Sequence, residues 1–166
     1  MSAQTGDAPD FLDIIKLLTG HEVDFIVVGG VAANLFGSAR LTYDLDIVYS
    51  RKEDNLRKMV TAFQNTNPYL RGAPPGLPFK LDLRTLKNGL NFTLTTDLGP
   101  IDLLGEIPGA CSFEELINDS LEINEPDLQF RCVTLQRLIQ LKNAAGRPKD
   151  LESLAELKAI LEDLNK

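Results

Sequence analysis

A short apolar run followed directly by two glycines constrains the fold of this chain most strongly. Residues Phe25–Val28 are all apolar and include β-branched side chains, which predicts an interior strand covered on both faces. The glycines at 29 and 30 end this strand, a short apolar helix follows over Val31–Phe36, and Gly37 closes the helix. Asp44–Tyr49 predicts a second strand, so we expect a sheet built around a strand, a glycine turn, a helix and a strand.

The rest of the chain predicts further helices and strands around this unit. Apolar residues at helical spacing and capping residues predict helices over 10–18, 54–63, 112–117 and 134–142, and from 148 onwards. Asn88-Gly89 lies between Leu81–Leu86 and Leu90–Thr95, which predicts a β-hairpin, and Ile101–Leu104 and Leu128–Val133 predict two more strands. This order predicts a mixed α/β (α+β) sheet with helices packed on it, including a C-terminal helical part over 134–166.

Length and composition bound the domain organisation and exclude several classes of protein. At 166 residues the chain is predicted to form one domain over 1–166, with a flexible N-terminus over 1–9. A net charge of −7 does not suit a general polyanion binder, and one histidine with two cysteines excludes a histidine cluster or a four-ligand zinc site. No apolar run reaches membrane-spanning length and the first ten residues do not form a signal peptide, so we expect a cytoplasmic protein without membrane contact.

Three aspartates form the candidate metal site. Asp44 and Asp46 are two residues apart on a predicted strand, so their side chains share one face. Asp102 lies in an apolar strand, where an unpaired carboxylate is costly to bury, so it either faces solvent or completes an acidic cluster. Such hard oxygen ligands suit Mg²⁺ or Mn²⁺. The alternative interpretation is that Asp44 and Asp46 are solvated acids that protect the edge of the sheet.

Glycines and basic residues predict a phosphate site near these acids. Gly29 and Gly30 permit a close approach between backbone and ligand, and the N-terminus of the following helix favours a phosphate group. Neither the P-loop motif nor the dinucleotide-binding fingerprint occurs. Lys142 projects from the apolar face of its predicted helix, either toward a triphosphate or toward solvent past an apolar stem. Arg40 precedes the acidic strand and is placed to meet phosphate or to pair with one of the two acids.

Two further segments are candidates for contact with substrate. From Arg131 to Lys149 the chain has five basic residues and no acidic one, so we expect any bound nucleotide or nucleic acid to lie near this segment. Arg147 and Lys149 belong to the start of the last helix, where we interpret them as surface charges, with contact to an acceptor substrate as the alternative. Residues 68–78 are rich in proline and glycine, which predicts an irregular loop that can lie over the site.

With these motifs the chain resembles the nucleotidyltransferases of the DNA polymerase β superfamily, and within it the small AbiEii/AbiGii-toxin-like proteins. The resemblance covers most of the chain in order and rests on Val27–Ala32, Gly37, Arg40–Asp46, Asp102, Leu138–Lys142 and Gly146–Asp150. It departs at Gly30, where many members of the superfamily have a serine whose hydroxyl contacts phosphate. Ser38 is the candidate substitute for that serine.

The resemblance implies a nucleotidyltransferase-like fold and metal-dependent transfer of a nucleoside monophosphate from an NTP to an acceptor hydroxyl. The implied acceptor is an RNA 3′ end or a protein, and the implied biological role is in a toxin–antitoxin pair, with an antitoxin as partner. Asp44 and Asp46 would hold two metal ions on the triphosphate, and Asp102 would serve the ion next to the acceptor. The nucleotide-binding candidates are Gly29, Gly30, Ser38, Arg40 and Lys142. Two alternatives are a non-catalytic binding or antitoxin-like protein with this fold, and a metal-dependent nuclease that uses the same acids.

Overall fold

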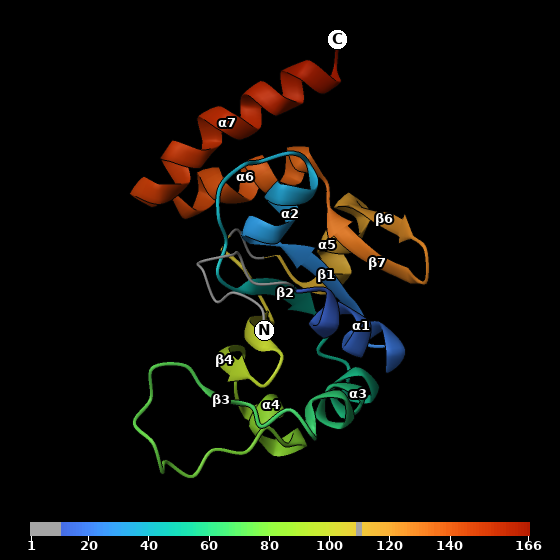
Figure 1. The fold of residues 1–166 in the computed structure, drawn as a ribbon, viewed down its shortest axis with the longest axis vertical. Helices are drawn as coiled ribbons and strands as arrows, with labels where there is room; N and C mark the ends of the chain where they lie inside the picture. The colour runs from blue at the N-terminus through green and yellow to red at the C-terminus, as the bar shows by residue number, and fades with distance from the viewer. Residues whose placement is uncertain (1–10, 109–110) are drawn as a thin grey trace, which may run out of the picture.

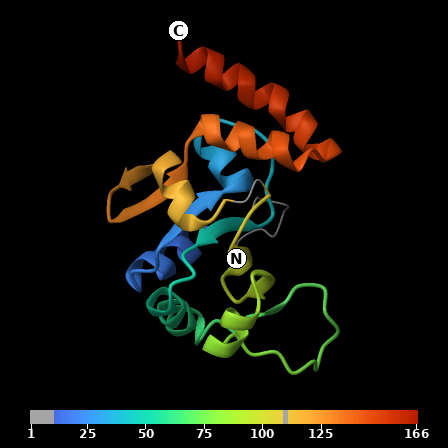
Figure 2. The same ribbon diagram turned by 180° about the vertical axis from the view of Figure 1, so that it is seen from behind.

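The computed structural model describes residues 11–108 and 111–166, which include one seven-stranded mixed sheet with helices around it (Figure 1). The strands are β1 (Phe25–Val28), β2 (Leu45–Tyr49), β3 (Tyr69–Leu70), β4 (Asn91–Thr96), β5 (Gly99–Leu104), β6 (Ser120–Glu125) and β7 (Leu128–Val133). The helices are α1 (Leu12–Gly20), α2 (Gly29–Leu35), α3 (Glu53–Phe63), α4 (Leu83–Asn88), α5 (Phe113–Leu116), the short 3-10 helix η1 (Ile117–Asp119), α6 (Leu135–Ala145) and α7 (Pro148–Leu164). Figures 1 and 2 show α2, α6 and α7 on one side of β1 and β2, and α1, α3 and α4 on the other. The predicted mixed α/β sheet with packed helices is confirmed.

The order of strands brings residues from distant parts of the chain together. The sheet runs β3-β4-β5-β2-β1-β7-β6, so β1 and β2 are interior strands. β1 pairs antiparallel with β2 and parallel with β7. β2 pairs in parallel with β5, in a register that sets Asp46 beside Asp102. Two predicted site residues from separate segments therefore lie on neighbouring strands.

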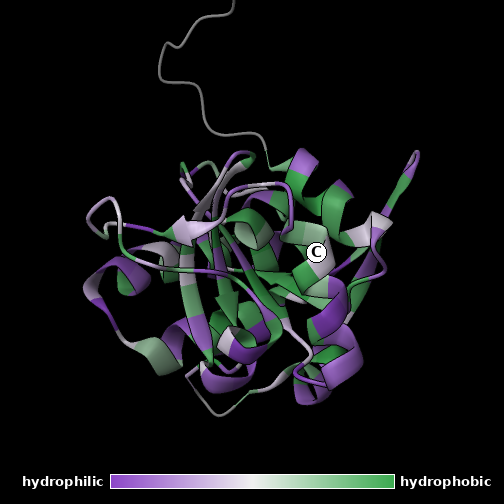
Figure 3. Cartoon of the chain, turned by 90° about the horizontal axis from the view of Figure 1, so that it is seen from below, coloured by the Kyte–Doolittle hydropathy of each residue, from purple (hydrophilic) through white to green (hydrophobic). Residues whose placement is uncertain are grey.

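The hydrophobic core lies against β1, as its apolar run predicts. All four residues of β1 are buried, and helix α1 contributes the fully buried Ile14 and Leu18 to the same core. Helix α3 adds Met59 and Phe63 to the same core. Figure 3 shows hydrophobic residues concentrated in the central strands and hydrophilic residues mostly on the outer helices. Burial of β1 fixes the position of the two glycines that follow it.

The predicted hairpin around Asn88 and Gly89 is wrong. Its first arm lies largely in α4, because the Asp82 carboxylate accepts a hydrogen bond from the backbone N–H of Thr85 at 2.8 Å and caps the helix. The hairpin in this region forms one element later, where β4 and β5 pair antiparallel. The sequence pattern also gave no signal for β6, which pairs antiparallel with the predicted strand β7, or for the two-residue strand β3.

The two C-terminal helices are confirmed and meet at a left-handed glycine. Gly146 has φ of +64° and donates its N–H to the Lys142 carbonyl at 3.1 Å, which ends α6 three residues later than predicted, at Ala145. Pro148 is the first residue of α7. Within the described residues, no helix is both long and apolar enough to cross a membrane. The predicted flexible segment over 1–9 lies outside the described residues.

Candidate active site

Three carboxylates meet at the end of β1 where α2 begins. Asp46 is the second residue of β2, Asp102 lies opposite it on β5, and Asp44 immediately precedes β2. One oxygen atom from each carboxylate lies within 4.8 Å of the others. The structure therefore brings together the three predicted metal-ligating residues, and the strand pairing explains why the distant Asp102 belongs with the other two.

The electrostatics of this acidic cluster favour a bound cation. Burial and the nearby negative charges of Asp44 and Asp102 together raise the pKa of Asp46 to about 8, and burial has the largest effect. At neutral pH the Asp46 carboxyl therefore holds a proton unless a positive charge stabilises the carboxylate. A divalent cation would supply that charge, and three carboxylates offer the hard oxygen ligands that Mg²⁺ and Mn²⁺ prefer. The donor set thus fits such an ion.

Gly29 is required by its contact with Asp46. Its φ is +67°, in the left-handed region, and a Cβ atom built at this position would lie 2.1 Å from Oδ2 of Asp46. Any side chain at position 29 would therefore displace the carboxylate from the acidic cluster. The glycine predicted to admit a ligand also has a structural reason to be glycine, because it leaves room for an acid of the site.

The close contact between Gly30 and Thr42 gives a structural reason for glycine at a position where many proteins of the resembled superfamily have serine. A Cβ atom at this position would lie 2.6 Å from the Thr42 hydroxyl oxygen, so the space that a serine side chain would need is filled. The Thr42 hydroxyl donates a hydrogen bond to the backbone carbonyl of Asp44 at 3.1 Å. Gly29 and Gly30 are the first two residues of helix α2, which has seven residues. The role of Gly29 and Gly30 in binding phosphate stays a prediction.

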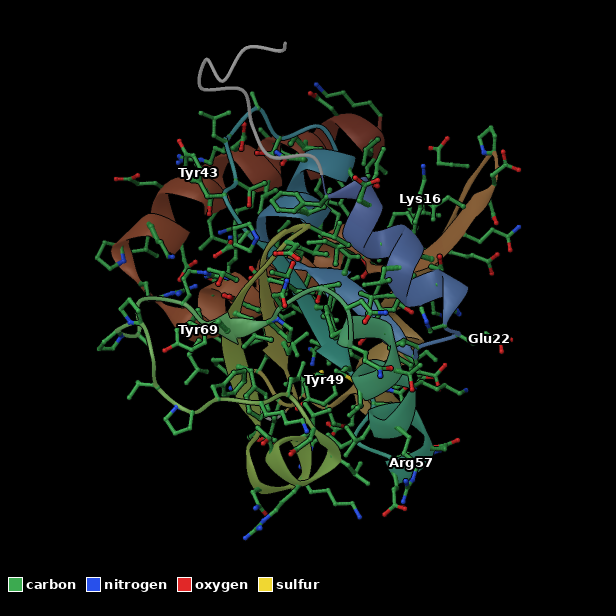
Figure 4. All side chains as sticks on the ribbon, turned by 60° about the horizontal axis from the view of Figure 1, so that its bottom comes forward. Lys16, Glu22, Tyr43, Tyr49, Arg57 and Tyr69 are labelled. Atoms are coloured by element: carbon green, nitrogen blue, oxygen red, sulfur yellow. The ribbon has the colours of Figure 1, made fainter. Side chains whose placement is uncertain are left out.

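Two cavities flank Asp46. The larger, of about 590 Å³, is bordered by α2, the segment that leads into β2, and the helices α6 and α7; its basic lining residues are Arg40, Lys142, Arg147 and Lys149. Tyr43, labelled in Figure 4, also lines this cavity and is 67% exposed. The smaller, of about 380 Å³, contains Asp102 and an apolar wall that includes Leu104, Ile107, Leu138 and Leu141. A third cavity of about 500 Å³ borders Phe25 at the other end of β1, and none of the three acids lines it.

One buried acid holds two basic residues near the junction of α6 and α7. Asp150 is 1% exposed, and its carboxylate accepts two hydrogen bonds from the Arg147 guanidinium, at 2.7 Å from Nε and 3.2 Å from Nη2. Lys142 Nζ lies 3.8 Å from the same carboxylate. Burial lowers the pKa of Lys142, and the carboxylates of Asp150 and Asp46 oppose that shift. Lys142 therefore points inward, as the sequence predicts, and lines both cavities.

Ser38 and Arg40 line the larger cavity but contact helix α7. The Ser38 hydroxyl donates to Oε1 of Glu156 at 2.6 Å, and Arg40 lies 3.8 Å from the same carboxylate and 3.9 Å from Glu152. Arg40 therefore pairs with acids of α7, and the predicted alternative in which it pairs with Asp44 or Asp46 is wrong. Both residues hold the segment before β2 against the last helix.

One residue of the site carries no signal in the sequence. Arg71 follows β3 at the start of the loop rich in proline and glycine, and Tyr69 in Figure 4 marks this strand. Its Nη1 atom lies 3.2 Å from Oδ2 of Asp44 and 3.0 Å from Oδ1 of Asp102. The first residues of the predicted loop therefore reach the acidic cluster, whereas Figure 1 shows the rest of the loop extending away from the sheet.

Comparisons with known proteins place the fold. The sequence matches no protein-family model and no curated protein. A candidate nucleotidyltransferase from Thermotoga maritima, TM1012, is similar in structure with a TM-score of 0.56 and 15% identity, over 88% of each chain. The lincosamide antibiotic adenylyltransferase LnuA, solved with lincomycin bound, gives a TM-score of 0.61 at 15% identity, over 93% of this chain and 99% of LnuA. The protein has the nucleotidyltransferase fold that the resemblance implies, and membership of the AbiEii/AbiGii-like subfamily stays a prediction.

Proposed function

We propose that this protein is a metal-dependent nucleotidyltransferase, which moves a nucleoside monophosphate from an NTP to an acceptor hydroxyl. The observation that carries the proposal is the convergence of Asp44, Asp46 and Asp102 beside a cavity lined with basic residues. A fold shared with an adenylyltransferase supports the same reaction class. Scattered carboxylates, or a cavity without cations, would not have supported it.

Asp44, Asp46 and Asp102 would hold the divalent cation, Mg²⁺ or Mn²⁺. When bound, the cation would supply positive charge to the triphosphate and to the charge that develops during phosphoryl transfer. The larger cavity suits the triphosphate, because Lys142, Arg147 and Lys149 line it. We place Gly29, Gly30, Ser38 and Arg40 at the border of the same nucleotide site, where they line this cavity.

The smaller cavity suits the acceptor, because Asp102 lines it and it shares Asp46 with the larger cavity. In the proposed step the acceptor oxygen forms a bond to the α-phosphorus, and the bond from that phosphorus to the bridging oxygen of the β-phosphate breaks. Pyrophosphate leaves, and the proton of the acceptor hydroxyl passes to the Asp102 carboxylate. Arg147 lines both cavities, so we place it between nucleotide and acceptor; Lys149 lines the nucleotide side.

The class of acceptor separates two versions of this proposal. The family resemblance favours a macromolecular hydroxyl, at an RNA 3′ end or on a protein, and with it a toxin–antitoxin role and an antitoxin partner. The similarity to LnuA favours a small molecule, and the smaller cavity, about 380 Å³ with an apolar wall, has the size of a small-molecule site. Either version uses an NTP, and we propose a cytoplasmic location because NTPs are abundant there.

A transfer assay tests the proposal. The protein is incubated with Mg²⁺ and each NTP labelled at the α-phosphate, together with total RNA, total cell protein or lincomycin. We expect label in one acceptor fraction, and a loss of at least about 100-fold for Asp46→Asn and Asp102→Asn. Asp163→Asn is the matched control, because Asp163 is an exposed acid at the far end of α7. Label that stays in the NTP with every acceptor, or equal transfer by Asp46→Asn, would contradict the proposal.

A further inference from the structure

Arg71 places a positive charge between two carboxylates of the acidic cluster. Its Nη1 atom lies 3.2 Å from Asp44 Oδ2 and 3.0 Å from Asp102 Oδ1, and the Arg71 side chain is 28% exposed. The cationic nitrogen therefore lies between the same two residues that the proposed function assigns to a divalent cation. Without it, the two carboxylates would face each other and Asp46 with no opposite charge from this loop.

The remaining contacts of Arg71 are few. Nη2 donates to the Leu94 carbonyl at 2.7 Å, whereas Nε is buried and has no hydrogen-bond partner among the described residues. Asp102 Oδ1 likewise accepts no hydrogen bond of good geometry there, although Nη1 lies 3.0 Å away. A guanidinium with one unsatisfied buried N–H is not optimally bound, because an unmet buried donor costs free energy. The arrangement is one that a better cation can replace.

The backbone around Arg71 permits its side chain to move without unfolding the sheet. The Arg71 N–H donates to the Thr93 carbonyl at 2.9 Å, which anchors the chain next to β3. Gly72 follows with φ of +81°, and no helix or regular strand occurs from there to Asp82. The side chain therefore extends from a fixed backbone position at the start of an irregular loop.

We propose that Arg71 is an internal counter-ion of the metal-free site, and that a divalent cation displaces its guanidinium from Asp44 and Asp102. The inference rests on the proposed function, since it assumes that the acids bind metal. A cation bound by the same two oxygens would overlap sterically with Nη1 and would be repelled by its positive charge. The cation and the guanidinium therefore cannot occupy the site together. Arg71 is thus a positioning residue that holds the acids in place until the metal arrives.

Metal affinity tests this competition. Mn²⁺ is titrated into the wild type, Arg71→Gln, Arg57→Gln and Asp46→Asn, and binding is measured by calorimetry. We expect Arg71→Gln to bind Mn²⁺ roughly tenfold more tightly than the wild type, because a competing cation has been removed. Arg57→Gln removes the same charge from a side chain that is 63% exposed and paired with Glu53, so it should leave the affinity unchanged.

A second measurement reports the displacement itself and does not depend on the folding of Arg71→Gln. Nitrogen–proton spectra of the wild type follow the guanidinium N–H signals as Mg²⁺ is added, with the Arg71 signal assigned by its loss in Arg71→Lys. We expect the Arg71 signal to shift and to exchange faster with water, while that of Arg51, which donates to the Leu86 and Lys87 carbonyls, stays unchanged.

The outcomes separate this inference from the proposed function. If the wild type binds no Mn²⁺, or Asp46→Asn binds it equally well, the proposed metal site is wrong and the inference falls with it. If the wild type binds Mn²⁺ but Arg71→Gln binds it with equal or lower affinity, or the Arg71 signal does not respond to Mg²⁺, the counter-ion role alone is overturned.

Discussion

Gly29→Ala is the most informative single substitution, because it perturbs the acidic cluster through the backbone without changing any charge. An alanine at φ of +67° costs about 1–2 kcal/mol relative to glycine. Its Cβ would lie 2.1 Å from Asp46 Oδ2, so the carboxylate must rotate away, which adds about 1 kcal/mol. We expect a total loss of about 2–3 kcal/mol in the free energy of unfolding, and a fall in Tm of about 6–9 °C.

The same substitution should weaken metal binding. A displaced Asp46 carboxylate no longer shares a centre with Asp44 and Asp102, so we expect Mn²⁺ affinity to fall about tenfold, equivalent to about 1.4 kcal/mol. Differential scanning calorimetry gives the stability and a Mn²⁺ titration gives the affinity. Both are measured on the purified full chain.

Gly146→Ala is the control for the backbone cost. Gly146 has φ of +64°, and the nearest atom to an added Cβ is the Asn143 carbonyl oxygen at 3.8 Å, an ordinary contact. We expect this variant to lose about 1–2 kcal/mol of stability and to bind Mn²⁺ as the wild type does. If Gly29→Ala is no more destabilising than Gly146→Ala and binds Mn²⁺ equally well, the close packing of Gly29 against Asp46 does not shape the site.

Three further predictions follow from the electrostatics of the site. Because the pKa of Asp46 is raised to about 8 and a bound cation requires the carboxylate, Mn²⁺ affinity measured by calorimetry should rise with pH and level off above about 8; an affinity independent of pH below 8 would contradict this. In the metal-free protein, urea titrations should show the free energy of unfolding falling as pH rises from 3.8 to about 8, since the folded state retains a proton that the unfolded state has released, and Asp46→Asn should remove that slope. Asp150→Asn should cost about 2–3 kcal/mol in the same urea titrations, because it leaves Arg147 and Lys142 without their buried partner, and a loss below 0.5 kcal/mol, about the value of a surface charge, would contradict the role of Asp150 as organiser.

Local pattern was sufficient to predict the part of the fold that carries the acids. The apolar run Phe25–Val28 is short and rich in β-branched residues, which favours an interior strand that is buried on both faces. The segment around Asn88 had two solutions. Its turn dipeptide favours a hairpin, but the Asp82 cap and helical packing against α3 determine the outcome, and the second effect depends on tertiary contacts.

The candidate site divides in the same way. The spacing along the chain was enough to predict that Asp44 and Asp46 lie close together and that Lys142 points inward, although Asp44 lies just before β2 and not within the strand as predicted. Arg71 could not be found, because its position depends on β3 joining the edge of the sheet and on the parallel register of β2 and β5. The contact between Thr42 and Gly30 could not be predicted for a related reason, since the path of the segment that leads into β2 places the Thr42 hydroxyl beside Gly30.

The fate of the two ends of an NTP tests the central claim most directly. The protein and Mg²⁺ are incubated with the acceptor fraction that takes up label in the transfer assay, and with NTP labelled either at the α-phosphate or at the γ-phosphate. Nucleotidyl transfer at Asp44, Asp46 and Asp102 predicts that the α label moves to the acceptor and the γ label appears in pyrophosphate, and that both transfers are lost in Asp102→Asn. A γ label on the acceptor, or RNA that shortens without NTP, would contradict the claim.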